Sequence, residues 1–501
     1  MRRSAATPTG RVGNGIVRRA GAEGEGEALQ DRRVVVLGAG LSGLGAAHWL
    51  ATQSVPCEVL ERGAEVGGLA RTLERNGYRF DYGGARFFAS SSEVRELLRR
   101  LLGDDLLTVA ASSRIYYRGK LYAYPLDPAD LVRGMGIEGT ASVLWGLVGG
   151  RLRRWLPLHR RRRDLESWLI EEFGETLYHA FFKDYNEKVW GEPCHNLSAE
   201  LASRRIRGLD LVGALKRALV PGAGGGSKRY AFLYPRFGIG QLSRRLAAVS
   251  EERGAQIRRE AAVTRLEIEG QRVRRVVYRD REGSVRETTG TDVISAIPLP
   301  RLLHILEPPP PGDVLASARS LKFRDMITVC LEIGRERVTS DSWLYVPERR
   351  IGFARVLEPR NWSAAMAPAG RSSLVAEYYC SEGDETWSRS DQQLIERTAQ
   401  DLAGPLGLIH HNEVLGGCAI RIRKAYPVYR IDYRAHLRRI QRYLRRIENL
   451  QTVGRGGLFR YHNVAHLLES GIRAAENVFG AGHDLYGLSE DSGESGFFPV
   501  A

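Results

Sequence analysis

One stretch, residues 33–71, restricts the possible folds of this chain more than any other. It opens with the apolar run Val34-Val35-Val36-Leu37, which is typical of a strand buried on both faces of a parallel sheet. A segment with helical character follows at residues 41–52, and a second apolar run covers residues 57–60. Strand, helix and strand in this order predict a β-α-β unit.

Glycines with the spacing GxGxxG join the first strand to the helix. Gly38 permits a tight turn, Gly40 lets the backbone approach a pyrophosphate, and Gly43 allows close packing of helix and strand. The free N–H groups and the positive dipole end of the helix then face the phosphates. Glu61 follows Gly38 by 61 − 38 = 23 residues, where a carboxylate can accept hydrogen bonds from ribose hydroxyls. The order of strand, glycines, helix, strand and carboxylate predicts a dinucleotide site. Glycines of ordinary turns would not be flanked by these elements in this order.

The composition is that of a globular protein with two or three domains. The 501 residues are 43% apolar and 27% charged, and no apolar run is long enough for a transmembrane helix. The first residues lack the apolar core of a secretory signal. Five cysteines without CxxC spacing indicate reduced thiols and a cytoplasmic location.

The formal net charge of +15 raises the hypothesis of nucleic-acid binding, which two observations disfavour. Only seven of the 74 basic residues are Lys, so the charge reflects a general use of Arg, and no nucleic-acid-binding module is visible. A basic protein instead suits an anionic small molecule such as a diphosphate. We therefore expect a small-molecule substrate, no nucleic-acid partner and no metal site, with the oligomeric state left open.

Helical and strand-rich regions alternate along the rest of the chain. Residues 1–30 are expected to be disordered, residues 89–107 to form a helix, and residues 114–124 to form a hairpin. A mostly helical insertion follows at residues 125–229. Its glycine-rich segment 221–227 is either a mobile lid or a plain linker.

Within that insertion, residues 141–158 are apolar, contain Trp, and are interrupted and followed by arginines. One interpretation is an amphipathic surface that makes a weak peripheral contact with a membrane or a lipid-linked substrate. The favoured interpretation is a core helix followed by a solvated basic turn. Vesicle flotation separates the two.

Strand patterns dominate the second half of the chain. Residues 255–297 alternate around glycine turns, and residues 315–425 contain further alternating runs that predict an antiparallel sheet as the substrate platform. The basic helix expected at residues 434–446 is interpreted as a solvated face.

Further glycine motifs make the chain resemble a known group of flavoproteins. They are Gly67-Gly68-Leu69-Ala70-Arg71, the segment from Gly77 to Phe88, and the segment from Leu450 to Phe479. Together with the dinucleotide unit, they resemble the FAD-binding enzymes of the amine oxidase, protoporphyrinogen oxidase and UDP-galactopyranose mutase group. The resemblance implies an α/β fold. Its parts are a discontinuous Rossmann-like FAD-binding domain of the GR2 type, an inserted helical domain and an antiparallel β-sheet substrate domain.

The implied domains interleave along the chain. The FAD-binding domain takes residues 31–110, 230–310 and 440–485, and the sheet domain takes residues 111–124 and 311–439. The helical insertion lies between them, and a flexible tail of residues 486–501 is expected at the end.

The resemblance also implies which residues hold FAD. Gly83 and Gly84 would lie beside the isoalloxazine, Val263 would meet the adenine, and the helix after Gly454 would point at the flavin pyrimidine ring. Many members of the mutase-like branch carry His after the two glycines, where this chain has Ala85. The complete expected set is Gly38, Gly40, Gly43, Glu61, Arg62, Gly68, Leu69, Arg71, Gly83, Gly84, Val263, Gly454, Arg455 and Ser470.

The segment LYHAFFKDYNEKVWG, residues 177–191, resembles the part of UDP-galactopyranose mutases that lines the sugar-nucleotide cleft. By that resemblance Phe181 stacks near the uracil, Tyr185 contacts the diphosphate and Trp190 lies by the sugar. Spacing alone favours three helix-core residues instead. One of the next two arginines corresponds to a cleft arginine of the family, and we assign Arg204 to substrate binding and Arg205 to catalysis.

By the resemblance, four residues of the second half are catalytic, and three of them match diphosphate-contacting positions of the mutases. Arg355 can hold two phosphate oxygens with its planar guanidinium, although the pattern alone would make it a solvent-facing strand charge. Tyr426 and Tyr461 match family tyrosines, and Asn463 stands where bacterial mutases often have Asp. His466 is either a base or a capping or packing residue.

On this resemblance the chain is an FAD-dependent enzyme that interconverts the pyranose and furanose forms of a nucleotide-diphosphate sugar. The reduced flavin forms an N5–sugar adduct, while the protein positions the substrate and stabilises the departing diphosphate. One alternative is an FAD-dependent oxidoreductase of the amine oxidase, protoporphyrinogen oxidase or desaturase type, in which hydride passes to flavin N5. Another is a flavin-binding protein without chemistry.

Overall fold

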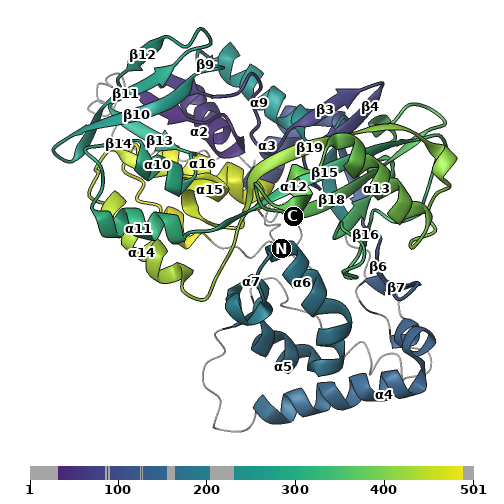
Figure 1. The fold of residues 1–501 in the computed structure, drawn as a ribbon. Coiled ribbons are helices and arrows are strands. Elements are labelled where there is room, and N and C mark those ends of the chain that lie inside the picture. Colours follow the sequence, from purple (N-terminus) through teal and green to yellow (C-terminus); the bar gives the residue numbers. More distant parts are fainter. Residues whose placement is uncertain are drawn as a thin grey trace, which may run out of the picture.

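The computed structural model describes residues 32–84, 87, 91–124, 126, 128–154, 164–203 and 231–488. They form two lobes built on sheets and a helical projection that extends away from both (Figure 1). Several expectations fall outside the described residues. They are the lead at residues 1–30, Ala85, residues 155–158 of the apolar segment, Arg204, Arg205, the glycine-rich segment 221–227 and residues 489–501 of the tail.

A five-stranded parallel sheet, in the order β20-β13-β1-β2-β9, forms the centre of one lobe. Its strands are β1 Val34–Leu37, β2 Cys57–Leu60, β9 Gln256–Arg258, β13 Asp292–Ser295 and β20 Leu450–Thr452. All four residues of β1 are buried, as its apolar run predicts. Because the strands come from distant parts of the chain, the discontinuous Rossmann-like fold is confirmed.

Four helices cover this sheet. They are α2 (Leu41–Thr52), α3 (Ser92–Leu102), α9 (Gly240–Glu252) and α16 (Val464–Asn477). Two of them, α2 and α16, contain glycines of the first and the C-terminal motif. α2 contacts both α9 and α16. A Cβ on Gly471 of α16 would lie 1.9 Å from the Ser42 carbonyl oxygen, so the close approach of α16 to α2 requires glycine there.

A second sheet of four strands lies beside the first, in the order β12-β11-β10-β14. Its strands are β10 Ala262–Glu269, β11 Arg272–Arg279, β12 Val285–Thr288 and β14 Leu306–Glu307. The remaining helices of this lobe are α10 Leu299–His304, α11 Gly312–Ser320, α14 Tyr433–Leu444 and α15 Gly454–Leu458. The glycines of residues 454–457 lie in the short helix α15.

The other lobe contains a seven-stranded sheet in the order β19-β15-β18-β17-β16-β6-β7. The strands are β6 Ser113–Tyr117, β7 Lys120–Tyr124, β15 Phe323–Ile333, β16 Trp343–Tyr345, β17 Arg355–Leu357, β18 Ser372–Cys380 and β19 Val414–Pro427. All pairings are antiparallel except that of β16 with β6, which is parallel. The sheet domain is therefore antiparallel in the main, as expected.

The two faces of this sheet have different neighbours. α12 (Glu385–Ser388) and α13 (Asp391–Ala403) pack on one face, where Ile327, Leu374 and Tyr378 share a core with Leu394. Because side chains alternate along a strand, Met326, Val375 and Tyr379 point to the opposite face. That face is turned toward the first lobe and carries the polar residues described below.

Two small pairings complete the sheets. β3 (Thr72–Arg75) pairs with β4 (Tyr78–Asp81), and β5 (Leu106–Ala110) pairs with β8 (Ala231–Pro235). Because of the second pairing, the helix expected at residues 89–107 is shorter in the structure. α3 ends at Leu102, and the chain then becomes the strand β5 because its partner β8 lies far along the sequence.

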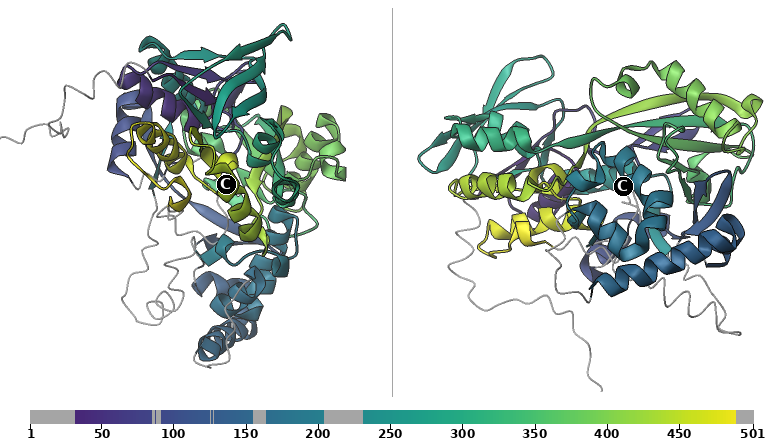
Figure 2. Two further views of the ribbon diagram at one scale, coloured as in Figure 1. Left: turned by 90° about the vertical axis from the view of Figure 1, so that its left-hand side faces the viewer. Right: turned by 60° about the horizontal axis from the view of Figure 1, so that its bottom comes forward.

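The helical projection consists of α4 (Pro128–Arg154), α5 (Leu165–Leu177), a π-helical turn (Tyr178–Phe182), α6 (Lys183–Trp190) and α7 (Glu200–Ser203) (Figures 1 and 2). In α4, Val143 is buried but Trp145 is 80% exposed. The core-helix interpretation of residues 141–158 is therefore only partly right, and a membrane contact stays a prediction. Among the described residues, no helix is long and apolar enough to cross a membrane.

Candidate functional site

The glycine loop between β1 and α2 has the shape of a phosphate cradle. Gly38 has a φ of +100°, and a Cβ on Gly43 would lie 1.9 Å from the Gly38 oxygen, so both positions require glycine. A Cβ on Gly40, in contrast, would meet nothing within 4 Å. No side chain caps the N-terminus of α2, and its first turn contains no acidic residue. The uncapped N–H groups of this helix start suit a pyrophosphate.

Glu61 lies at the edge of this cradle and is held by backbone amides. Ala39 N donates to Glu61 Oε2 and Gly63 N donates to Glu61 Oε1, both at 2.8 Å. Each carboxylate oxygen keeps a lone pair for a ribose hydroxyl. Ala261 N donates to the Glu61 carbonyl, so β10, which contains Val263, begins beside Glu61. Arg62 is exposed.

The second glycine turn packs directly on the first. Gly67 N donates to Ala39 O at 2.7 Å, and a Cβ on Gly68 would lie 3.2 Å from Gly40 Cα. Leu69 is 38% exposed. Arg71 Nε donates to Gly68 O, and its guanidinium lies 4.3 Å from the ring centre of Tyr82. The two motifs thus form one continuous surface.

The third glycine pair joins this surface to the seven-stranded sheet. Gly84 N donates to Glu377 Oε1 at 3.0 Å, and Glu377 Oε2 accepts from Arg355 Nε at 2.7 Å. A Cβ on Gly83 would approach Met326, and one on Gly84 would lie 3.1 Å from Arg355 Nη2. The glycines therefore allow the guanidinium to sit against the backbone.

Arg355 and Glu377 are completely buried, so the idea of a solvent-facing strand charge is wrong. Burial alone would lower the pKa of Arg355, but the adjacent Glu377 carboxylate raises it, and the net direction is upward. Among the described residues Arg355 Nη1 has no hydrogen-bond acceptor. A buried guanidinium with unused donors suits an anionic ligand.

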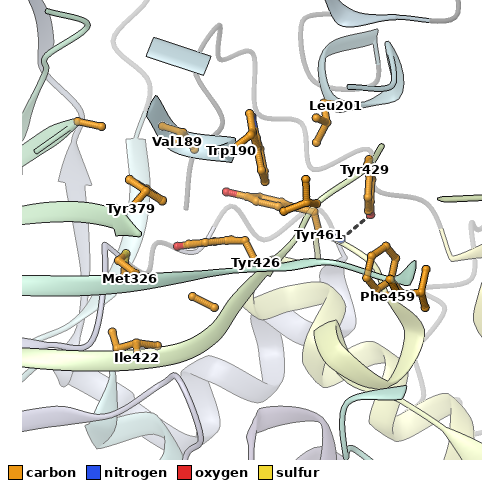
Figure 3. Close-up of a cluster of buried hydrophobic side chains, with 14 of the residues drawn as sticks. Val189, Trp190, Leu201, Met326, Tyr379, Ile422, Tyr426, Tyr429, Phe459 and Tyr461 are labelled. Carbon is orange, nitrogen blue, oxygen red and sulfur yellow. Dashed lines mark hydrogen bonds between the residues drawn. The ribbon is translucent and has the colours of Figure 1, made fainter. Parts of the chain in front are cut away.

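Aromatic side chains from four segments surround this guanidinium. The rings of Tyr426 and Tyr461 stack with centroids 5.4 Å apart, Tyr379 lies 5.8 Å from Tyr426, and Trp190 lies 6.1 Å from Tyr461 (Figure 3). Trp190 Nε1 has no acceptor among the described residues. The structure thus brings together Trp190, Tyr426 and Tyr461, which the sequence placed in one site.

Tyr185 belongs to the same group. It is buried, its ring lies 5.8 Å from that of Tyr345, and burial raises its pKa well above the usual value, against the opposing effect of Arg355. Phe181 is different. It packs between Tyr117 and Tyr122, at 5.1 and 5.3 Å, in the aromatic core that joins the projection to β6 and β7. The spacing-based interpretation of Phe181 as a core residue agrees with this position better than a ligand contact does.

Ser470 and Arg455 of the C-terminal motif bind to segments that neighbour the site. Ser470 is buried and links three elements, since its hydroxyl accepts from Gly454 N and contacts Ser42 Oγ and Leu467 O. Arg455 donates to the carbonyls of His462 and Ala425 and lies over the ring of Tyr426 at 4.9 Å. Both residues position the chain around the site in this structure.

Asn463 is the N-cap of α16, where its side-chain oxygen accepts from His466 N at 3.1 Å. His466 is buried in the first turn of α16, which favours the packing interpretation. His462 is fully buried, and both of its ring nitrogens lack partners among the described residues. Burial and the nearby His466 and arginines lower the pKa of His462 well below its usual value, so it is a neutral imidazole.

Sequence reasoning missed Glu377, Tyr379 and Lys188. Glu377 is the one charged residue of β18, a strand that is otherwise apolar or hydroxyl-bearing and buried throughout. A carboxylate in such a run is the signal that could have identified it, because buried charges require a partner. Lys188 stands inside the aromatic segment, but nothing in the pattern shows that its ammonium lies among backbone carbonyls.

Comparison with known proteins identifies the scaffold. The family described as flavin containing amine oxidoreductase matches residues 41–478. A reduced UDP-galactopyranose mutase structure superposes with a TM-score of 0.78 at 20% identity, covering 93% of this chain and 99% of that one. A putative protoporphyrinogen oxidase from Exiguobacterium sp. 255-15 superposes with a TM-score of 0.69 at 18% identity, covering 90% and 99%. At these identities both likenesses show the fold alone.

Two plant enzymes match in sequence. Protoporphyrinogen oxidase 2, chloroplastic/mitochondrial, of Arabidopsis thaliana is 38% identical over 126 residues, which are 24% of this chain and 22% of the enzyme. The chloroplastic protoporphyrinogen oxidase of Nicotiana tabacum is 26% identical over 183 residues, or 36% and 33%. The chain thus spans a third or less of the length of these relatives.

Proposed function

The chain belongs to the flavin-containing amine oxidoreductase family and is an FAD-dependent flavoenzyme, and from this premise we propose that it is a sugar-nucleotide mutase. The proposed reaction interconverts the pyranose and furanose forms of a nucleotide-diphosphate sugar. FAD fits the residues present, because the open position at Gly40, the uncapped start of α2 and the Glu61 carboxylate match its pyrophosphate and ribose.

The observation that carries the proposal is the buried guanidinium of Arg355. It is held by Glu377, faces the tyrosine group and keeps the donors of Nη1 unused among the described residues. A neutral, apolar substrate would leave these donors unsatisfied at a cost of roughly 1–3 kcal/mol or more. A diphosphate would accept from them and from tyrosine hydroxyls. The fold likeness to a UDP-galactopyranose mutase supports the same class of ligand.

Each residue has a role in this proposal. Arg355 binds the diphosphate and stabilises its charge as it departs from the sugar, while Glu377 fixes the plane of the guanidinium. Tyr185, Tyr426 and Tyr461 orient the phosphates, and Trp190 covers the sugar. FAD, when bound in reduced form, supplies the nucleophile for the sugar. Arg204 and Arg205, which lie outside the described residues, stay candidates for the second cleft arginine.

The domain division proposed for this reaction follows the sheets. We assign residues 31–110, 230–310 and 440–485 to FAD binding, residues 111–124 and 311–439 to the substrate sheet, and residues 125–229 to the insertion. The ligand then lies where α6, β17, β18 and β19 face the glycine turns. This arrangement places the guanidinium and the third glycine pair together.

A second candidate is a flavin-dependent oxidoreductase of the protoporphyrinogen oxidase type. The two plant relatives support it, and so does the apolar character of the wall formed by Val189, Met326 and Ile422 (Figure 3). In that case hydride passes from the substrate to the flavin, and oxygen reoxidises it.

One assay separates the candidates. The FAD-loaded protein is incubated with UDP-, GDP- and dTDP-linked hexoses, with and without dithionite, and the pyranose and furanose forms are separated by chromatography. The mutase proposal predicts interconversion of one of them only after reduction. Peroxide release or flavin bleaching with amines, porphyrinogens or polyenes, and no interconversion, would contradict it in favour of the oxidoreductase.

A further inference from the structure

Lys188 lies on α6 between the two aromatic residues that this helix contributes to the site, Tyr185 and Trp190. Its side chain does not turn toward the site. Its Nζ donates to four backbone carbonyls, those of Val346, Glu348, Ile351 and Phe353, at distances of 2.7 to 3.2 Å. All four belong to one loop.

That loop is residues 346–354, and it connects β16 to β17. It begins directly after Tyr345, whose ring contacts Tyr185, and it ends directly before Arg355. The loop is therefore the covalent link between one wall of the site and its guanidinium. Within the loop, Val346 N donates to Ala354 O, and Ala354 N ties the loop to β18 by donating to Glu377 O. Arg349 of the loop also pairs with Asp184 and Glu187 of α6.

Four carbonyls around one nitrogen constitute a site for a cation. An ammonium has three N–H donors and no lone pair, so it can satisfy this cage, with one proton shared. A neutral amine has two donors and a lone pair that would face a carbonyl oxygen. The cage thus requires the charged form of Lys188.

We propose that Lys188 is a positioning residue, whose ammonium fastens α6 to the loop 346–354 and thereby sets the distance of Tyr185 and Trp190 from Arg355. The inference deepens the proposed function, because the UDP titration that tests it rests on that function. Loss of the proton releases the loop and weakens the grip on the diphosphate.

The burial of Lys188 allows this loss of the proton near neutral pH. Burial lowers the pKa of Lys188 to about 7, from 10.5, with Asp184, Glu348 and Asp401 opposing this effect and Arg349 adding to it. These groups come from α6, the loop and α13, and Asp401 is itself paired with Arg397. Since the folded pKa is lowered, the ammonium is lost as the pH rises through about 7.

Two variants of the FAD-loaded protein test the inference. Lys188→Met removes the ammonium and keeps the side-chain volume. Lys183→Met is the matched control, because it removes the same charge from the same helix, and among the described residues Lys183 makes no hydrogen bond to the loop. Hydrogen exchange of residues 346–354 is measured without ligand, and UDP is titrated between about pH 6 and 9.

We expect loop amides of Lys188→Met to exchange about tenfold faster than those of wild type at the low end of this range, the scale of one lost charged hydrogen bond. The dissociation constant for UDP rises by a similar factor and loses its pH dependence. Lys183→Met behaves as wild type.

Wild-type exchange and wild-type UDP affinity in Lys188→Met would overturn the inference. If the wild type binds no UDP, the proposed function fails, but the exchange measurement still decides whether Lys188 holds the loop. Faster exchange in Lys188→Met alone supports the clamp in that case, and equal exchange removes it.

Discussion

Arg355 and Glu377 face each other across neighbouring strands and form an ion pair that no solvent reaches. They are direct partners in the register of β17 and β18, Arg355 Nη2 lies 2.6 Å from Glu377 Oε2, and both side chains are fully buried. A buried pair of this kind contributes little net stability, but removing one partner leaves an uncompensated charge. The pair is therefore better explained by the ligand that it prepares to bind than by stability.

The ion pair dictates which substitution tests Arg355. Arg355→Ala would leave Glu377 alone and cost about 3–5 kcal/mol of stability. Arg355→Lys keeps a charge for Glu377 but loses the planar group with its unused donors. We expect Arg355→Lys to fold, to retain FAD and to lose at least about tenfold in affinity for a nucleoside diphosphate, measured by calorimetry. Wild-type affinity in this variant would remove Arg355 from the ligand site.

Gly40 and Gly43 of the first motif are predicted to have different roles, Gly40 in binding FAD and Gly43 in packing α2. Gly40→Ala has room within the protein and an ordinary φ of −72°, so its unfolding temperature without FAD should match that of wild type. The new methyl group would lie where the pyrophosphate approaches, so FAD affinity should fall at least about tenfold. Flavin fluorescence titration measures this.

Gly43→Ala is the contrasting variant. Its Cβ would collide with the Gly38 oxygen, so we expect lower thermal stability with or without FAD. If Gly40→Ala bound FAD as wild type does, the cradle would be in the wrong place.

The hydroxyl groups of Tyr426 and Tyr461 are predicted to bind the diphosphate. Tyr426→Phe and Tyr461→Phe keep the stacked rings, so their unfolding temperatures should stay near that of wild type. Their kcat/KM should fall by roughly three- to tenfold, the scale of one hydrogen bond. Tyr378→Phe is the control, because Tyr378 lies on the opposite face of the sheet and pairs with Thr398. Equal losses in all three variants would argue against a ligand role.

Asp81 predicts an unusual dependence of stability on pH. Burial raises its pKa to about 6 from 3.8, although Thr72, Tyr234 and Ile239 N donate to its carboxylate. Because the folded form binds the proton more tightly than the unfolded form, this contribution is complete below about pH 4 and is lost as the pH rises through about 6.

Asp81→Asn removes this titration. The free energy of unfolding of wild type relative to the variant should fall by up to about 3 kcal/mol across that interval. Urea unfolding of both proteins at its two ends measures the difference. Parallel pH curves for the two proteins would show that Asp81 does not titrate in this way.

The parts of the fold that could be predicted are those fixed by local geometry. Gly38 predicts the turn because its φ of +100° favours glycine, and Gly43 predicts the close packing of α2 because a Cβ there would lie 1.9 Å from the Gly38 oxygen. The helix expected at residues 89–107 ended early because β5 pairs with β8, and no local pattern contains a partner more than a hundred residues distant.

Only those site residues that lie in a family motif could be predicted from the sequence. Trp190, Tyr426 and Tyr461 converge as the resemblance implied, but Glu377 and the carbonyl cage of Lys188 depend on strand register and on a loop from another segment. The substrate contact of Phe181 stays a prediction, because the pattern of a helical segment is the same whether an aromatic residue faces a ligand or only neighbours such as Tyr117 and Tyr122, which its ring contacts. The periodicity and spacing of residues in the sequence do not show such tertiary contacts.

The proposed binding of a nucleoside diphosphate is best tested by titrating the FAD-loaded protein with UDP, GDP and dTDP, oxidised and dithionite-reduced, while flavin fluorescence is followed. We expect micromolar binding of one diphosphate and a loss of affinity of at least about tenfold in Arg355→Lys. The absence of binding of any diphosphate in both redox states would contradict the mutase proposal and leave the oxidoreductase as the function of this site.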